Sequence, residues 1–174
     1  RDNFKLFVVK VNSEDEKLIW LGKNLEKLPG SGILYTGTRV DTEIYSRWFE
    51  HLKISSTGYN AGLDPESRIA IENGLMNNQW KCIISTNALG MGIDKPDIRF
   101  IIHTQIPQSP IHYYQEIGRA GRDGQSSYII LFYNPKDKEL PEAFIEGGRP
   151  SIKKYEKVLA AVKAELLGEK DLMR

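Results

Sequence analysis

Short runs rich in β-branched and aromatic residues alternate with helical patterns from one end of the chain to the other. Because consecutive parallel strands need a long crossover between them, this alternation restricts the chain to an α/β fold. The runs 83–84 and 100–102 are continuously apolar, which is typical of strands covered on both faces. We therefore expect a three-layer α/β/α domain with a mainly parallel central sheet of about six strands. The expected strands are 4–11, 32–36, 54–59, 81–85, 99–103 and 128–133.

Helix start signals separate these strands. Ser13 with Glu16 three residues later predicts a capping box, and Asp64 and Ser109 each precede a proline that suits the first turn of a helix. Apolar residues at helical spacing then indicate which side of each helix faces the core. The expected core residues are Val40, Ile44, Trp48 and Leu52 in the second helix and Ile69 and Leu75 in the third.

The stretch 147–150, Gly-Gly-Arg-Pro, resembles a linker. Beyond it, apolar residues recur at helical spacing as far as Leu166, so we expect a helical C-terminal tail. The expected organisation is one α/β domain over residues 1–146 and a linker with a terminal helix over residues 147–174. That helix either packs on the domain or begins the next one.

The composition excludes several classes of site. With 24 basic and 23 acidic residues the net charge is +1, so any contact with phosphate must depend on a local cluster. Cys82 is the single cysteine, which excludes an internal disulfide and a multi-cysteine zinc site. His51, His103 and His112 fall in different expected elements, so we expect no metal site. No apolar stretch approaches the roughly 20 residues of a membrane span. We expect an intracellular protein, cytoplasmic if it is bacterial.

The segment 115–124 is the strongest candidate for chemistry. It begins with Gln115 and holds two arginines, Arg119 and Arg122, among three glycines near the end of an expected helix. The guanidinium group presents a rigid fork of donors that fits phosphate, and glycines let a ligand or a facing domain approach the backbone. Three residues apart on a helix, the two arginines would share a face. The alternative is that they are ordinary surface charges in a glycine turn.

The segment 85–96 follows an apolar strand, and ligands of open parallel sheets bind beyond the carboxyl ends of strands. The hydroxyls of Ser85 and Thr86 suit a phosphate backbone, and Asp94 can accept from a ribose or pair with an arginine. Gly90 and Gly92 do not make a dinucleotide fingerprint, because lysine stands at position 95, where the third glycine belongs.

Taken together, these segments resemble a known family. Residues 85–100 resemble the fifth motif of superfamily 2 helicases, and residues 115–124 resemble the sixth. In both motifs the residue pattern is most similar to that of the RecQ branch. Residues 32–39 resemble the fourth motif. Residues 59–63 resemble the family's Tyr-His-Ala-Gly-Leu segment, with Asn60 in the second place. The resemblance covers about residues 1–140 in the right order, and it implies the second RecA-like motor domain of an ATP-dependent DNA helicase.

The resemblance also implies roles for residues at a nucleotide site. In such helicases ATP, with Mg²⁺, lies between two RecA-like domains, and the first domain binds most of it. Arg122 would be the arginine finger that stabilises charge on the transferred phosphoryl group. Arg119 would be its partner, reaching the phosphates or holding Asp94. Gln115, Asp94 and Gly92 would lie next to the nucleotide.

The resemblance further implies a DNA partner, as single strand and duplex junction, with unwinding in the 3'–5' direction and roles in repair and recombination. Hydroxyls and one arginine would hold strand phosphates without reading bases, as a motor that travels over any sequence requires. The expected nucleic-acid contacts are Thr36, Thr38, Arg39, Ser85 and Thr86.

The sequence holds neither a Gly-x-x-x-x-Gly-Lys-Ser/Thr loop nor an Asp-Glu-x-His box. In the family both belong to the first motor domain. We therefore expect the chain to be a monomeric part of a longer polypeptide, partnered by that first domain and unable to hydrolyse ATP or unwind DNA alone. Two alternatives stay open: a RecA-like module that binds nucleic acid without motor activity, and a domain of an RNA helicase.

Overall fold

The computed structural model describes residues 1–87, 89 and 93–138. All six expected strands are present, within two residues of the expected ends. The elements are β1 (Phe4–Lys10), α1 (Glu14–Asn24), β2 (Ser31–Tyr35), α2 (Arg39–His51), β3 (Ser56–Tyr59), α3 (Pro65–Met76), β4 (Cys82–Ser85), β5 (Ile98–His103), α4 (Pro110–Ile117) and β6 (Ser127–Tyr133), with 3-10 turns at Leu25–Lys27 and Pro135–Lys138.

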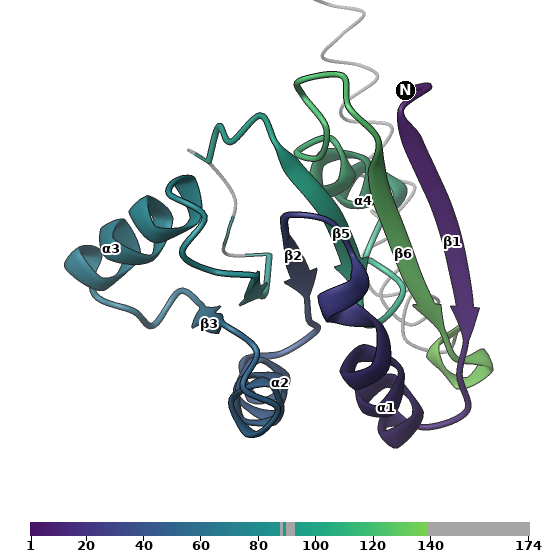
Figure 1. Ribbon diagram of the computed structural model, residues 1–174. Helices are drawn as coiled ribbons and strands as arrows, with labels where there is room; N and C mark the ends of the chain where they lie inside the picture. The colour runs from purple at the N-terminus through teal and green to yellow at the C-terminus, as the bar shows by residue number, and fades with distance from the viewer. Residues whose placement is uncertain (88, 90–92, 139–174) are drawn as a thin grey trace, which may run out of the picture. The chain divides into compact units, whose positions relative to one another are not determined.

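The strands form a single six-stranded sheet in the order β1-β6-β5-β2-β4-β3 (Figure 1). Every neighbouring pair is parallel, which confirms the expected topology. The central strand β2 sets the register, because Ile33 lies opposite Ile83 of β4 and Ile101 of β5. β1 and β3 are the outermost strands of the sheet.

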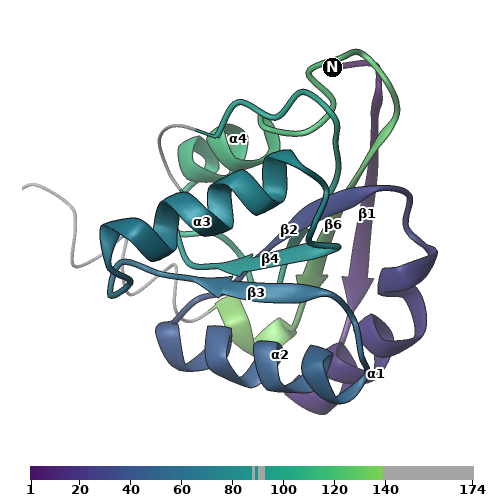
Figure 2. The same ribbon diagram turned by 60° about the vertical axis from the view of Figure 1, so that its left-hand side comes forward.

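Helices cover both faces of the sheet, which confirms the three layers. Figure 2 shows α1 and α2 on one face and α3 and α4 on the other. Successive strand residues point to opposite faces, so Leu34 packs in the cluster that contains Leu21 of α1 and Phe49 of α2. Its neighbour Ile33 packs in the cluster that contains Leu75 of α3 and Ile117 of α4. The apolar strands therefore separate two cores.

The expected core face of α2 is partly wrong. Tyr45 and Phe49 are buried together with Thr42, whereas Val40 and Ile44 are 64% and 48% exposed. The helix carries two overlapping apolar stripes, and the one with the two aromatic rings removes more apolar area from water. The same error occurs in α3, where Leu75 is buried as expected but Ile69 is exposed.

The expected helix caps are present, with one difference. The Oγ of Ser13 accepts the Glu16 N–H, and the Asp64 and Ser109 side chains cap α3 and α4 in the same way. The Glu16 carboxylate reaches back to the N–H of Asn12 at 2.8 Å, one residue before the expected position. Among the described residues, no helix is long and apolar enough to cross a membrane. The expected boundary at residue 146, the linker and the terminal helix lie outside the described residues.

Candidate functional site

The loop that joins α4 to β6 carries both candidate arginines and is fixed to the amino-terminal ends of the strands. The Gly121 N–H donates to the carbonyl of Ile98, the first residue of β5, at 3.0 Å. The Asp123 N–H donates to Pro96 O at 3.2 Å. Gly121 has a φ of +55°, which favours glycine, and an added Cβ would lie 2.5 Å from the Asn3 side chain. The loop is therefore held in one conformation.

This location corrects two expectations. α4 ends at Ile117, so Arg119 and Arg122 follow the helix and do not share a helical face. Asp94 and Arg122 also lie at the amino-end edge of the sheet, not beyond the carboxyl ends. The reason is that the parallel strands all begin at this edge, so Asp94 precedes the start of β5, and α4 leads from the end of β5 back to the start of β6 (Figure 1). The start of the segment 85–96, from Ser85 to Asn87, does lie at a carboxyl end.

Arg122 is accessible and pairs with Asp94, whereas the resemblance gave Arg119 either this role or a contact with the phosphates. Arg122 Nη1 lies 2.5 Å from Asp94 Oδ1, and the two side chains are 39% and 83% exposed. An ion pair exposed to this degree contributes about 0–1 kcal/mol, so a phosphate can displace the carboxylate at little cost. The guanidinium is thus held in place without being locked inside the fold.

Arg119 is half-buried, two residues after the end of α4, and lies near Tyr35 in a group of aromatic and charged side chains. Burial raises the pKa of the Tyr35 hydroxyl, and the nearby Arg119 guanidinium acts in the opposite direction. The Tyr35 ring stacks on His103 at 5.3 Å, and His103 Nε2 lies 2.7 Å from Glu116 Oε2. Gln115 is exposed on α4, one residue before Glu116. Gly92 lies outside the described residues.

An ion pair fixes the end of the segment that carries Asp94. The buried Lys95 ammonium lies 2.5 Å from Asp97 Oδ1 and lowers the pKa of that carboxyl group. A lowered pKa stabilises the fold above the ordinary carboxyl value of about 4, and this stabilisation is lost as pH falls through the lowered value. We expect Asp97→Asn to reduce the free energy of unfolding at pH 7 and to have a smaller effect below pH 4, as measured by urea denaturation. An effect independent of pH would contradict this assignment.

The five expected nucleic-acid contacts meet at the opposite, carboxyl-end edge, where β2 and β4 are neighbours. The Thr36 N–H donates to Ser85 O at 2.8 Å. Both of these side chains are buried, whereas Thr38 and Arg39 are exposed and Thr86 is half-buried. The structure therefore brings the predicted residues together. Of these, only Thr38, Arg39 and Thr86 are accessible to a nucleic-acid strand.

Local hydrogen bonds explain the shape of this edge. Thr38 is the N-cap of α2 and forms a reciprocal capping box with Asp41. The Thr36 hydroxyl lies 2.9 Å from the Thr42 hydroxyl, beneath the same turn. Arg39 is at 3.7 Å from Glu43, a loose contact between exposed side chains that leaves the guanidinium available.

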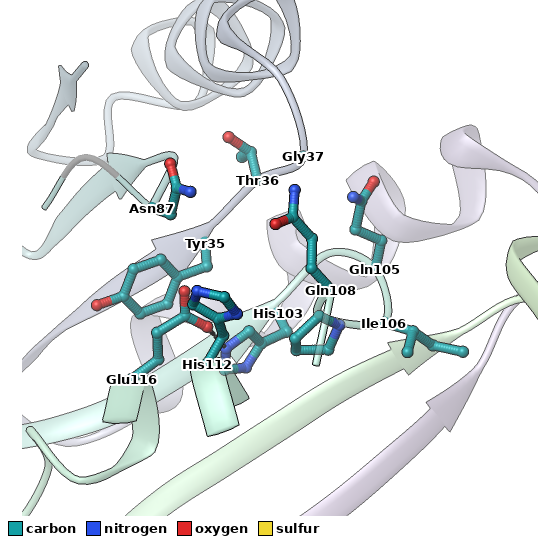
Figure 3. A pocket seen from close by; sticks show the side chains of 11 residues that line it. Tyr35, Thr36, Gly37, Asn87, His103, Gln105, Ile106, Gln108, His112 and Glu116 are labelled. Carbon is teal, nitrogen blue, oxygen red and sulfur yellow. Dashed lines mark hydrogen bonds and ion pairs between the residues drawn. The ribbon is translucent and has the colours of Figure 1, made fainter. Parts of the chain in front are cut away.

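A pocket of about 100 Å³ adjoins this edge, and sequence reasoning missed it (Figure 3). The end of β2 and the turn after it, the loop between β5 and α4, and α4 itself line it, with Gly37, Gln105, Gln108 and His112 among the lining residues. The available signal was the position of Gln105, two residues after the last residue of a buried strand, where ligand-binding residues of parallel sheets lie.

Within the part of the chain that the structure describes, no three His, Cys, Asp or Glu residues come together as metal ligands. Cys82 is buried, and burial raises the pKa of its thiol to about 12, which makes it an unreactive core residue.

Comparison with known proteins identifies the family. The sequence matches the family described as helicase conserved C-terminal domain over residues 16–124, more than half of the chain. The chain belongs to this helicase C-terminal domain family. The matched range contains the candidate residues at both the amino-terminal and the carboxyl-terminal ends of the strands. β1 and β6 lie outside it.

The relatives of this helicase C-terminal domain include RecQ-like helicases, as the residue patterns of its motifs predict. It is 41% identical over 154 residues to the probable ATP-dependent DNA helicase RecS of Bacillus subtilis, covering 84% of the chain and 30% of RecS. It is 38% identical over 150 residues to the RecQ-like DNA helicase blm-1 of Caenorhabditis elegans, covering 85% of the chain and 15% of that protein. These matches confirm the resemblance to the RecQ branch. The chain spans less than a third of the length of either relative.

A solved structure confirms the RecA-like fold of the helicase C-terminal domain. The Escherichia coli DEAD-box protein SrmB, in its complex with the regulator of ribonuclease activity A, aligns with a TM-score of 0.71 at 20% identity. The alignment covers 80% of this chain and 82% of that one. At this identity the likeness establishes the architecture alone.

Proposed function

We propose that this helicase C-terminal domain is the second motor domain of a RecQ-type ATP-dependent DNA helicase. The observation that carries the proposal is the accessible Arg122 guanidinium on a loop fixed by backbone hydrogen bonds to the start of β5. Its ion-pair partner, Asp94, is itself exposed and easily displaced. In this arrangement Arg122 meets ATP that a first motor domain of the same polypeptide binds.

The chemistry at Arg122 is electrostatic. As the γ-phosphoryl group transfers to water, negative charge spreads over its oxygens, and a planar cation at that place lowers the barrier without moving a proton. Asp94 holds the guanidinium until the phosphate replaces the carboxylate. Arg119 approaches the phosphates from its half-buried position, and Gln115 responds to the nucleotide from the exposed side of α4. Mg²⁺ accompanies the ATP and is assigned no ligand in this chain.

The opposite edge of the sheet binds the DNA backbone in this proposal. Arg39 pairs with a phosphate, and the hydroxyls of Thr38 and Thr86 position the strand. Thr36 and Ser85, which are buried, support the turn from beneath rather than contact the strand. ATP and DNA thus bind at opposite edges of the sheet. Closure of the two motor domains around ATP at one edge can then move a DNA strand that is held at the other.

The experiment uses the full-length protein that carries this domain. With ATP it should unwind duplex DNA with a 3' single-stranded tail and leave 5'-tailed DNA and RNA duplexes intact, as measured by strand displacement on gels. The isolated domain should show no ATP turnover. Equal unwinding of RNA would identify an RNA helicase. Nucleic-acid binding with no ATP-dependent unwinding would identify a binding module instead.

A further inference from the structure

Two buried polar atoms on the face of the sheet that α3 and α4 cover form no hydrogen bond with the residues that the structure describes. They are the hydroxyl of Tyr35, the last residue of β2, and Nδ1 of His103, the last residue of β5. The two residues are only 4% and 2% exposed. A buried polar group without a partner is costly, so each one that a fold keeps calls for an explanation. The stability of the domain alone does not provide one.

These two side chains form a polar cluster with Glu116 of α4 and with Arg119. The Tyr35 ring stacks on the His103 ring at 5.3 Å, and His103 Nε2 lies 2.7 Å from Glu116 Oε2 (Figure 3). Burial raises the pKa of the Tyr35 hydroxyl, the Arg119 guanidinium acts to lower it, and the Glu116 carboxylate acts to raise it. The hydroxyl therefore lies near a cation and an anion. Because a hydroxyl both accepts and donates, either group can become its partner after a small movement.

The cluster connects the two edges of the sheet. At the carboxyl-end edge, Tyr35 is followed directly by Thr36, which begins the turn that leads into α2. At the amino-end edge, Arg119 is three residues before Arg122, and its N–H donates to Glu116 O at 3.2 Å. A shift of the turn or of the arginine loop therefore displaces a member of the same buried cluster. Buried side chains transmit such a shift because the packed interior is dense and yields little.

We propose that Tyr35 and Glu116 are positioning residues that couple DNA binding at the carboxyl-end edge to the placement of the arginine loop at the amino-end edge. The inference rests on the proposed function, which assigns DNA to one edge and ATP to the other. When a strand moves the turn after β2, the Tyr35 hydroxyl changes its partner between Glu116 and Arg119, and the loop with Arg122 moves accordingly. Tyr35 and Glu116 act through Arg119 and not by contact with ATP.

The test is the stimulation of ATP hydrolysis by single-stranded DNA in the full-length protein. Tyr35→Phe removes the hydroxyl and keeps the ring that stacks on His103. Saturating oligo(dT) should stimulate its ATP hydrolysis about fivefold less than in wild type, with the rate without DNA and the affinities for ATP and oligo(dT) unchanged. Its urea midpoint should equal or exceed that of wild type, because the hydroxyl has no hydrogen bond to lose.

A second buried tyrosine is the matched control. Tyr45 of α2 is 2% exposed, and its hydroxyl lies 3.3 Å from Glu14 Oε2 on the other face of the sheet. Tyr45→Phe should therefore lower the urea midpoint and leave the stimulation by oligo(dT) as in wild type.

Glu116→Gln tests the other member of the pair. It removes the negative charge and keeps an acceptor for His103, and it should reduce the stimulation by oligo(dT) as Tyr35→Phe does. The double variant should lose no more than either single variant, because both changes interrupt the same connection. Losses that multiply in the double variant would contradict a shared connection.

Reciprocity provides a measurement without catalysis, since two coupled binding sites change each other's affinity by the same factor. The factor by which a non-hydrolysable ATP analogue changes the affinity for oligo(dT) should fall toward one in Tyr35→Phe and stay as in wild type in Tyr45→Phe.

The inference and the proposed function fail in different ways. A wild-type protein whose ATP hydrolysis does not respond to DNA would reject the proposed function and the coupling with it. A wild-type protein that responds, with the same response in Tyr35→Phe, would reject the coupling alone. Equal losses of the rates with and without DNA in Tyr35→Phe would also overturn it, because the hydroxyl would then support the ATP site directly.

Discussion

An Arg122→Ala variant of the full-length protein that carries this domain is expected to hydrolyse ATP about a thousandfold more slowly than wild type, with ATP affinity within about threefold. The affinity survives because the first motor domain makes most ground-state contacts in this proposal. The rate falls because Arg122 meets charge that develops only in the transition state. Steady-state ATP hydrolysis with saturating single-stranded DNA, together with a titration of a fluorescent ATP analogue, measures both quantities.

The control for Arg122 is another exposed arginine. Arg47→Ala removes the same group from α2, on the other face of the sheet, and should leave both kcat and affinity as in wild type. A loss in Arg122→Ala that lies wholly in ATP affinity would make the residue a ground-state anion contact. That result would favour the binding-module alternative.

Replacement of Gly32 by alanine is expected to destabilise the domain by roughly 3 kcal/mol, the upper end for overpacking of a core. Gly32 lies in the central strand β2, and an added Cβ would be 2.2 Å from the carbonyl oxygen of Phe100. The two residues are partners in the parallel register of β2 and β5, so neither backbone can move without disturbing the ladder. The free energy of unfolding is measured by urea denaturation followed through tryptophan fluorescence.

A glycine in an edge strand provides the comparison for Gly32. In Gly58→Ala of β3 the added Cβ would meet only the ends of the Ser46 and Thr42 side chains, at 3.1 and 3.2 Å. These atoms can shift, so a loss well below that of Gly32→Ala is expected. If the two variants unfold at the same urea concentration, the backbone contact with Phe100 is not what constrains Gly32.

The strands and their parallel direction could be predicted from the sequence, because the information is local. Apolar runs such as 100–102 are bounded by caps and turns, and each connection is long enough for a crossover. The strand order could not be predicted, since the pairing of β1 with β6 joins segments that are far apart in the chain. Nothing in residues 4–11 specifies that partner.

The sequence indicated which residues form the candidate site better than it indicated where they lie. The motif resemblance singled out Arg122 and Asp94, which the structure joins in an ion pair, yet the rule on carboxyl ends put Asp94 at the wrong edge. That rule applies to the residues directly after a strand, such as Thr86, and Asp94 follows only after the chain has crossed the sheet. The pocket was missed because Gly37 and Gln105 come together only through the pairing of β2 with β5.

The most direct test of the account is the trapping of a transition-state analogue, ADP with tetrafluoroaluminate and Mg²⁺, by the full-length protein. Wild type should form a slowly dissociating complex, and Arg122→Ala should bind ADP equally well but fail to form that complex. If Arg122→Ala retains ADP–tetrafluoroaluminate as long as wild type does, the guanidinium at position 122 does not stabilise the transferred phosphoryl group.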